Sequence, residues 1–380
     1  ILKALYKGAK ILILDEPTGV LTPQETEELF RIFGALKQQG VTIMLITHKL
    51  REIMSITDQV SVMRAGQMVA HRDTQDTSRE ELAELMVGRK VLLQVDKKPA
   101  NVRAPLMKVK RLTVADSQGI ERLKDVSFEL RAGEVLGVAG VSGNGQTELL
   151  EALSGITAMT SGSIEVLGFE MDAKNPLTPD RLRDMGLAHV PEDRHRMGLI
   201  SDFSASESAL LGYHKDSKIN SGIWLSNSKV EANCQALMAA FDVRPADPNL
   251  KSANFSGGNQ QKLILAREME RNPDVLLIGQ PTRGVDIGAI EFIHQRIIDM
   301  RDAGKAVLLV SVELDEIMSV SDRIIVLCDG EISGRIDAAD ADERTLGMMM
   351  ANALDPIDPL QTMDDQLAFA KQESNQEAQV

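Results

Sequence analysis

The sequence predicts an α/β fold in which strands and helices alternate around a parallel sheet. Residues 11–15 form a short apolar run, rich in isoleucine, that is typical of a buried strand. Thr22, Pro23 and Glu25 then provide a capping box with proline at the first helical position, so a helix is expected to begin there. Residues 41–46 are predicted as the next strand. A strand, a helix and a strand at this spacing are typical of a βαβ unit, whose strands lie parallel.

A second observation is an internal repeat with a constant offset of 264 residues, which relates Asp15 to Gly279 (279 − 15 = 264). Three segments recur with it: ILILDEPT (11–18) as VLLIGQPT (275–282), THKLREI (47–53) as SVELDEI (311–317), and ITDQVSVMRAG (56–66) as VSDRIIVLCDG (320–330). An ungapped repeat of this kind predicts two copies of one domain. Because Ile1 falls inside an apolar helical pattern, we expect an incomplete first copy and a chain that is the C-terminal part of a longer protein.

The repeat divides the chain into four predicted parts. Residues 1–88 are expected to be the C-terminal part of the first copy, and residues 106–353 a complete second copy. Residues 89–105 mix charge and proline without a period and are predicted to be a linker. Residues 354–380 are acidic and rich in glutamine, which predicts a flexible tail.

Composition excludes several classes of protein. The 380 residues include 42 Lys and Arg against 56 Asp and Glu, a formal net charge of −14, whereas a chain that wraps nucleic acid needs excess cations. Only 12 residues are aromatic (9 Phe, 1 Trp and 2 Tyr), too few for a base-stacking surface. The two cysteines, Cys234 and Cys328, cannot form a disulfide framework and fit a reducing compartment. No apolar run approaches the ~18 residues that a membrane-spanning helix needs.

A glycine-rich segment, GVSGNGQT at 140–147, follows an apolar strand and precedes a helix. It matches the phosphate-loop pattern G-x-x-x-x-G-K-[ST], except that Gln146 stands where the pattern has lysine. Glycines let backbone N–H groups turn toward a phosphate, the helix N-terminus adds a partial positive charge, and Thr147 stands where a hydroxyl would bind Mg²⁺. The predicted nucleotide-binding residues here are Gly140, Ser142, Gly143, Asn144, Gly145, Gln146 and Thr147. Taken alone, the segment fits an ordinary strand-to-helix turn equally well.

A second segment, SGGNQQK at 256–262, begins 116 residues after the glycine-rich loop (256 − 140 = 116). The segment and its spacing resemble the signature of the ATP-binding cassette (ABC) ATPases. The resemblance implies P-loop NTPase-type nucleotide-binding domains with a mixed, mainly parallel sheet and a helical signature subdomain. It also implies that the signature's backbone N–H groups and serine hydroxyl contact the γ-phosphate of ATP bound to the opposite cassette. The signature residues are Ser256, Gly257, Gly258, Asn259 and Gln260.

Three residues of the first copy match catalytic positions of this family. By that resemblance Asp15 orients Mg²⁺ through water, Glu16 polarises the water that attacks the γ-phosphate, and His48 contacts that phosphate. The resemblance therefore implies ATP and Mg²⁺ as cofactors, with Thr147 and Asp15 as the residues nearest the metal in their respective copies. Asp15, Glu16 and His48 are expected to share one site with the signature of the second copy.

The second copy departs from the family at each of these positions. The residues that replace aspartate, glutamate, histidine and the phosphate-loop lysine are Gly279, Gln280, Val312 and Gln146. Glu192 in HVPEDR stands where most cassettes have the glutamine that senses Mg²⁺ and the membrane partner. The stretch 107–119 lacks the aromatic residue that commonly stacks on adenine. We therefore expect one hydrolytic site and one degenerate site that binds nucleotide more weakly.

Further motifs narrow the resemblance. The motifs are MVGR (86–89), PEDR (191–194), SGGNQQK (256–262) and PTRGVD (281–286). With the tandem cassettes, they look like the ATPase subunits of bacterial monosaccharide and nucleoside importers, over about residues 1–350. Gln280 favours nucleoside import; a ribose- or galactose-type importer and a non-hydrolysing ATP-binding fragment are the alternatives. Asp286 is expected to cap the following helix, and it also matches a family residue that contacts the opposite cassette.

The resemblance also implies partners: two permease subunits, which would dock near Glu192 and residues 200–250, and a solute-binding lipoprotein. The protein is then expected at the cytoplasmic face of the inner membrane, as a peripheral subunit that binds no nucleic acid. A ribosome-associated tandem ATPase would need a long charged helix between its cassettes, and a chromosome-structure ATPase a long coiled coil before its signature. The linker at 89–105 and the 116-residue spacing leave room for neither.

Overall fold

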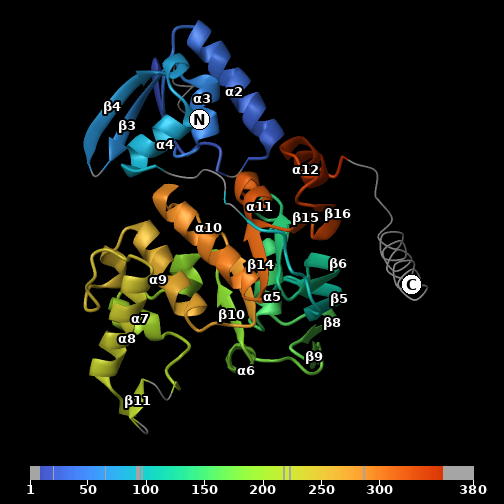
Figure 1. Cartoon of the computed structure of the whole chain (residues 1–380). Coiled ribbons are helices and arrows are strands. Elements are labelled where there is room, and N and C mark those ends of the chain that lie inside the picture. The colour runs from blue at the N-terminus through green and yellow to red at the C-terminus, as the bar shows by residue number, and fades with distance from the viewer. Residues whose placement is uncertain are drawn as a thin grey trace, which may run out of the picture.

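The structure is a computed structural model that describes residues 9–19, 21–64, 66–90, 95, 97–216, 219–221, 224–285 and 287–353 (Figure 1). The predicted tail at 354–380, part of the predicted linker, and Asp286 lie outside these residues. In Figure 1 the first copy is the blue group of elements, and the larger second copy runs from green to red beneath it.

The first copy has two small sheets and three α-helices among its described residues. In chain order its elements are β1 (Ile11–Asp15), α2 (Pro23–Gln38), β2 (Thr42–Ile46), α3 (Leu50–Ile56), β3 (Gln59–Arg64), β4 (Gln67–Asp73), a 3₁₀ turn (Thr74–Asp76) and α4 (Arg79–Val87). β1 and β2 pair in parallel, as predicted, whereas β3 and β4 form an antiparallel hairpin. The predicted capping box is formed: the hydroxyl of Thr22 accepts the backbone N–H of Glu25, whose carboxylate accepts the backbone N–H of Thr22.

The second copy is built on a six-stranded sheet with strand order β10-β13-β14-β7-β15-β16. These strands are β10 (Leu187–Val190), β13 (Val275–Gly279), β14 (Ala306–Ser311), β7 (Glu134–Ala139), β15 (Arg323–Cys328) and β16 (Glu331–Asp337). All neighbours are parallel except β15 and β16, so the sheet is mixed and mainly parallel, as predicted. A separate antiparallel sheet has the order β6-β5-β8-β9, with β6 (Glu121–Arg131), β5 (Pro105–Ala115), β8 (Ser161–Val166) and β9 (Phe169–Asp172).

The central strand β7 is buried on both faces, which explains its continuous apolar sequence. Val135 and Ala139 pack into one core with the helices α9 (Gly257–Met269), α10 (Ile287–Asp302) and α11 (Leu314–Val320). Leu136 and Val138 pack into a second core with the antiparallel sheet and with α5 (Gln146–Leu153). The remaining helices are α6 (Pro179–Asp184), α7 (Ala205–Leu210), α8 (Asn227–Ala240) and α12 (Glu343–Met350).

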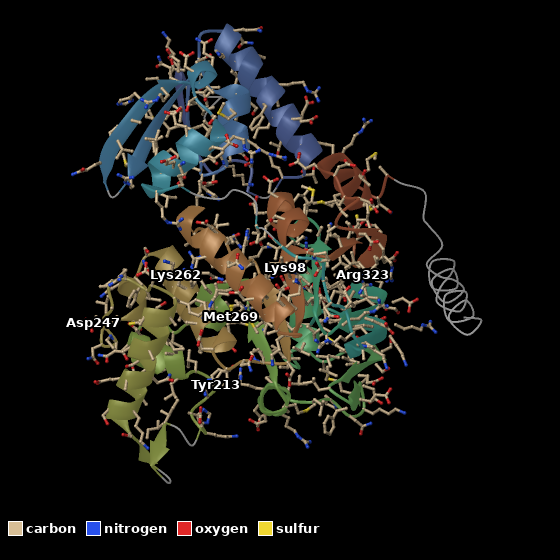
Figure 2. The ribbon with its side chains drawn as sticks, in the orientation of Figure 1. Lys98, Tyr213, Asp247, Lys262, Met269 and Arg323 are labelled. Atoms are coloured by element: carbon tan, nitrogen blue, oxygen red, sulfur yellow. The ribbon has the colours of Figure 1, made fainter. Side chains whose placement is uncertain are left out.

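The expected helical subdomain is formed by α7, α8 and α9, beside a short hairpin of β11 (Asn220–Ser221) and β12 (Trp224–Leu225). Phe241, at the end of α8, is fully buried and meets Phe292 of α10 edge-on, with 5.3 Å between ring centroids. Tyr213, labelled in Figure 2, donates its hydroxyl to Glu268 of α9 at 2.5 Å and lies under the guanidinium of Arg271 at 4.4 Å. The contact of Phe241 with Phe292 joins the subdomain to α10. The contacts of Tyr213 with Glu268 and Arg271 fix the segment after α7 to α9.

The internal repeat recurs in three dimensions, element by element. With the offset of 264, the counterparts are β1 and β13, α2 and α10, β2 and β14, α3 and α11, β3 and β15, β4 and β16, and α4 and α12. The backbone agrees even at an unusual position, since Glu16 and its counterpart Gln280 both have positive φ angles, 44° and 48°. One chain path therefore carries two different sets of side chains.

The described part of the linker runs along the second copy. The carbonyl of Lys98, labelled in Figure 2, accepts a hydrogen bond from the guanidinium of Arg301 at 2.8 Å, and Lys97 donates to the carbonyl of Ser321. Arg301 is itself buried and paired with Asp322 at 2.8 Å. The linker is thus attached to the ends of α10 and α11.

Candidate nucleotide-binding sites

The glycine-rich loop lies between the end of β7 and the start of α5. Gly143 and Gly145 have φ angles of 95° and 102°, a region that favours glycine. A Cβ on Gly140 would lie 2.8 Å from the carbonyl oxygen of Leu327, so this position has no room for a side chain. The turn leaves the N-terminus of α5 open toward solvent, as a phosphate-binding loop requires.

Four predicted residues of this loop line one cavity of about 380 Å³: Ser142, Gly143, Gln146 and Thr147. Its other lining residues are Leu150, Glu151, His189, Glu192, Asp193, Arg196, Met197, Gln280 and Arg283. The structure therefore brings together the loop, Glu192 and Gln280, which are far apart in the sequence. Sequence reasoning missed His189, Arg196 and Arg283 as lining residues. The signal was present for both arginines, which lie in or beside the PEDR and PTRGVD motifs.

The side chain of Gln146 provides a test of whether this cavity suits a phosphate. Gln146 is only 2% exposed, and its Nε2 atom has no hydrogen-bond partner among the described residues. An unpaired buried donor is costly, and a phosphate oxygen at the N-terminus of α5 would satisfy it. The loop therefore fits the phosphates of a nucleotide, with an amide in place of a cation.

Glu192 and Gly279 fit each other closely. A Cβ on Gly279 would lie 2.5 Å from Cγ of Glu192 and 2.8 Å from Cδ1 of Leu150. The carboxylate of Glu192 accepts hydrogen bonds from the hydroxyl of Thr147 and from the side chain of Gln280. Burial raises the pKa of Glu192, against the effect of these two hydrogen bonds. Glu192 thus occupies the space beside the strand end where the first copy carries Asp15.

Thr147 and Glu192 supply oxygen atoms of the kind that Mg²⁺ prefers. Among the described residues, no cluster of three or more His, Cys, Asp or Glu side chains forms a ready metal site.

In the first copy, the acid pair and the histidine form a cluster at the ends of β1 and β2. One carboxylate oxygen of Glu16 lies 2.8 Å from Nδ1 of His48 and also accepts the backbone N–H of His48 at 3.2 Å. Thr47 donates to the other carboxylate oxygen at 3.4 Å. Burial alone would raise the pKa of Glu16, but the hydrogen bonds and charge of His48 lower it. Asp15 is exposed at the end of β1.

The hydrogen bond to Glu16 raises the pKa of His48 despite partial burial, and the charges of Glu16 and Glu313 act in the same direction. At the counterpart of this cluster, the side-chain oxygen of Gln280 accepts the backbone N–H of Val312 at 3.4 Å. The amide of Gln280 and the apolar side chain of Val312 cannot exchange a proton at neutral pH. The backbone of the site is thus repeated without its acid–base chemistry.

The signature segment forms the start of α9. Ser256 is exposed at the N-cap, where its hydroxyl accepts a hydrogen bond from the side chain of Asn259 at 2.9 Å. Gly257 has no room for a side chain, because a Cβ would lie 2.6 Å from Nη2 of Arg194. Gln260 points inward and donates to the carbonyl of Ser252 at 2.9 Å. Gln260 therefore holds the loop in place, while the start of the segment around Ser256 stays open.

The structure does not join the two halves of the expected hydrolytic site. Among the described residues, no hydrogen bond or ion pair connects Asp15, Glu16 or His48 with the segment 256–260. The predicted pairing of this acid cluster with the signature of the second copy therefore remains a prediction.

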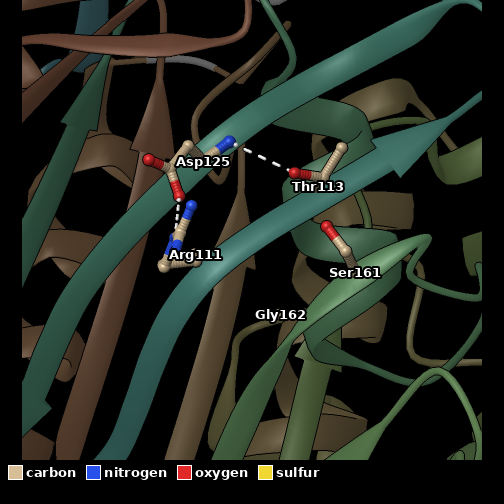
Figure 3. A pocket seen from close by; sticks show the side chains of 5 residues that line it. All are labelled: Arg111, Thr113, Asp125, Ser161 and Gly162. Carbon is tan, nitrogen blue, oxygen red and sulfur yellow. Dashed lines mark hydrogen bonds and ion pairs between the residues drawn. The ribbon is translucent and has the colours of Figure 1, made fainter.

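A second hollow, of about 370 Å³, lies on the antiparallel sheet (Figure 3). Its lining residues are Arg111, Thr113, Asp125, Ser161 and Gly162. The guanidinium of Arg111 is paired with Asp125 at 2.9 Å, and the backbone N–H of Asp125 donates to Thr113 at 3.3 Å. The cation already has a partner, and all five lining residues lie on strands β5, β6 and β8, so they offer no helix N-terminus to a phosphate. None of the described helices is both long and apolar enough to span a bilayer.

A mixed sheet with a glycine-rich loop, a helical subdomain and a signature helix defines the class of ATP-binding cassettes. Residues 123–283 match the ABC transporter family. A dimeric ATP-binding cassette solved with ADP and phosphate has the same fold, with a TM-score of 0.53 at 24% identity over 61% of this chain and 98% of that chain. The predicted fold class is confirmed.

Curated relatives identify the family more closely. The chain is 46% identical to the nucleoside import ATP-binding protein NupA of Lactococcus lactis subsp. cremoris, over 92% of this chain and 69% of that protein. It is also 46% identical to the guanosine import ATP-binding protein NupO of Bacillus subtilis, over 93% of this chain and 69% of that protein. The ribose import ATP-binding protein RbsA of Lactococcus lactis is 36% identical, over 91% of this chain and 68% of that protein. The chain belongs to the ATP-binding proteins of ABC importers, a family of transport ATPases.

Proposed function

We propose that the protein powers the import of a nucleoside by hydrolysing ATP at one site and binding it without hydrolysis at another. The observation that carries this proposal is the contrast between Glu16 paired with His48 and Gln280 beside Val312 on the same backbone. The names of the relatives at 46% identity support a nucleoside as the solute, while a glucose import relative at 43% and a ribose import relative at 36% keep a sugar as the second candidate.

In the proposed hydrolytic site, the carboxylate of Glu16 accepts a proton from the attacking water, and His48 holds that carboxylate in place until phosphate arrives. Asp15 orients Mg²⁺ through water, and Ser256 at the open end of the signature contacts the γ-phosphate from the opposite cassette. ATP with Mg²⁺ supplies the phosphoryl group. Positioning and charge placement by these side chains supply most of the rate.

In the proposed degenerate site, Gln146 and the backbone of residues 140–147 hold the phosphates, and Thr147 with Glu192 supports Mg²⁺. The cavity binds nucleotide, but Gln280 cannot act as a general base. We assign residues 1–88 to the first cassette and residues 106–353 to the second.

The proposed partners are two permease subunits and a solute-binding lipoprotein, at the cytoplasmic face of the membrane. We assign the permease-binding surface to the region near Glu192 and the helical subdomain. A displacement of Glu192 by the permease would move Thr147 in the cavity, because the two side chains are hydrogen-bonded. Closure of the cassettes around ATP would then switch the permease between its two states.

The testing experiment measures phosphate release from ATP by the chain and by a version extended upstream to the length of its relatives. We expect turnover in the extended version only, and its loss after Glu16→Gln. Turnover by the 380 residues alone, or normal turnover after Glu16→Gln, would contradict the assigned roles. The solute is identified by comparing the uptake of labelled guanosine with that of labelled ribose in the presence of the permease.

A further inference from the structure

Two ion pairs between the copies join residues that occupy the same position in each copy. Nζ of Lys49 lies 2.9 Å from the carboxylate of Glu313, and the guanidinium of Arg51 lies 3.4 Å from Asp315. The offset of 264 converts residue 49 into residue 313 and residue 51 into residue 315. Each pair therefore unites a residue with its own counterpart.

A contact between equivalent residues marks a two-fold axis, because only points near such an axis are brought next to their own images. The helix contacts agree with this arrangement. α4 of the first copy packs on α10 of the second, and the counterpart contact, α12 on α2, is also made. Figure 1 shows α2 beside α12 and α4 above α10. The two copies thus meet across a pseudo-two-fold axis that passes between α3 and α11.

The charges at this axis are inverted between the copies. The first copy carries Lys49 and Arg51, whereas the second carries Glu313 and Asp315. A third inverted position lies next to them, since Arg51 is also paired with Glu343 of α12, whose counterpart is Arg79. In an exact two-fold pair, the side chains at positions 49 and 51 would each face a copy of themselves, and the side chain at position 51 would also face the counterpart of Glu343.

The first turn of α3 does not by itself favour a lysine at position 49. Lys49 and Glu313 are the N-cap residues of α3 and α11, and neither side chain caps its helix. An anion at this end of a helix is favoured by the helix dipole and a cation is disfavoured. Glu313 therefore suits its own helix, whereas Lys49 is stabilised by ion pairs, with Glu313 at 2.9 Å and with Glu52 in the first turn of α3 at 3.9 Å.

We propose that these inverted charges select which copies pair: a first copy pairs with a second copy, and two identical copies are repelled across the same axis. Two second copies would place Glu313 against Glu313 and Asp315 against Asp315, and two first copies would place cations together. The device goes beyond the proposed function, because it concerns which halves assemble and not what they hydrolyse.

The expected effect comes from repulsion as much as from attraction. The side chains of Lys49 and Glu313 are 22% and 34% exposed, and those of Arg51 and Asp315 are 45% and 56% exposed, so each attraction is modest. Specificity is the difference in free energy between the pairing of unlike copies and the pairing of identical copies. Two ion pairs that change from attraction to repulsion are together expected to shift the equilibrium between these pairings about tenfold. Electrostatic selection of this kind weakens as salt is added.

The test is hydrogen–deuterium exchange on the full chain at low salt, with three variants. The variants Lys49→Glu/Arg51→Asp and Glu313→Lys/Asp315→Arg each place like charges at the axis. We expect each to increase exchange about tenfold in α3, α4, α10 and α11. The fourfold variant, which exchanges the charges between the copies, is made together with Glu343→Arg so that position 51 again faces side chains of opposite charge, and it is expected to return exchange to within about twofold of the original. In 0.5 M NaCl all of these differences should shrink.

A matched control is Lys174→Glu/Arg181→Asp, which makes the same charge change at exposed residues in and near α6, on the side of the second copy that faces away from the first copy in Figure 1. It should leave exchange in the four helices unchanged. Exchange in β7 and β14 reports whether each variant is folded. If the fourfold variant exchanges as fast as the double variants, or if the control has the same effect, charge selection at the axis is refuted.

Discussion

The two copies share one backbone but differ in what covers it. Ile11 and Ile13 of β1 are 66% and 62% exposed, whereas their counterparts Val275 and Leu277 of β13 are completely buried. In the second copy, β14 and β15 both pair with β7, and an antiparallel sheet covers one face. Among the described residues of the first copy, no strand joins β2 to β3, so the two small sheets stay separate. Burial is thus a property of neighbouring layers as well as of the strand's own sequence.

The copies also differ in chemistry at the shared strand ends. Glu16 and His48 form a charged pair that shifts both pKa values, whereas Gln280 and Val312 keep only a backbone hydrogen bond. The strained turn is kept in both copies although the acid is kept in one. The turn therefore does not depend on the carboxylate, and in the proposed function the side chains on this turn determine which site hydrolyses ATP.

The largest expected effect comes from removing the carboxylate at position 16 and introducing one at its counterpart, position 280. In the version extended upstream, Glu16→Gln is expected to lower ATP turnover at least about 100-fold, because it removes the general base. Adding Gln280→Glu to the Glu16→Gln variant is not expected to restore ATP turnover, because Gly279 and Val312 still stand where the first copy has an aspartate and a histidine. Turnover measured as phosphate release checks both variants. Restored activity in the Glu16→Gln/Gln280→Glu double variant would show that the second site is not degenerate.

The difference in burial predicts unequal effects from matched truncations. Leu277→Ala is expected to lower the free energy of unfolding by about 2–5 kcal/mol, because it leaves a cavity in a fully buried strand. Ile13→Ala, at the counterpart position, is expected to change it by less than about 0.5 kcal/mol, because that side chain is exposed. Urea unfolding followed by circular dichroism measures both. Equal losses would mean that β1 is covered in solution.

The phosphate loop of the second copy predicts a gain of affinity from a single change. Gln146→Lys is expected to tighten ATP binding about tenfold, because a charged donor is worth about 1–2 kcal/mol more than an amide. Gln146→Leu removes the unpaired donor and is the control that should weaken binding. Calorimetric titration of the chain with ATP and Mg²⁺ measures both. Identical affinities for all three would place the phosphates elsewhere.

The smallest predicted effect is the pH dependence of the Glu16–His48 pair. Because the pKa of His48 is raised in the folded state, its protonated form stabilises the fold. This contribution is complete below pH 6.5 and is lost as the pH rises through the raised pKa. Because the pKa of Glu16 is lowered in the folded state, its ionised form stabilises the fold above pH 4.5. This contribution is lost as the pH falls through the lowered pKa. The pair is thus strongest between these pH values. NMR titration of His48 should give a pKa above 6.5 that falls in Glu16→Gln, with Glu28→Gln as an exposed control; no change would contradict the pairing.

Part of the site was predictable because its rules are local. The capping box at Thr22 and the glycine-rich loop depend on backbone geometry within a few residues, and the offset of 264 identified Gln280 as the counterpart of Glu16. The role of Gln260 was not predictable from its motif, because its side chain bonds to Ser252 inside the protein. The lining of the cavity by Arg196 and Arg283 was missed although both lie in or beside recognised motifs, because only the fold brings these two motifs to the same cavity.

The sequence by itself determined the repeat, the order of strands and helices, and which residues are capable of acid–base or phosphate chemistry, since these depend on short-range pattern and residue type. The tertiary structure decided the rest. It placed Glu192 in the space that Gly279 leaves open, buried one copy of a strand and exposed the other, and brought Lys49 against Glu313. These outcomes depend on which distant segments pack together, and packing is settled by the whole folded chain.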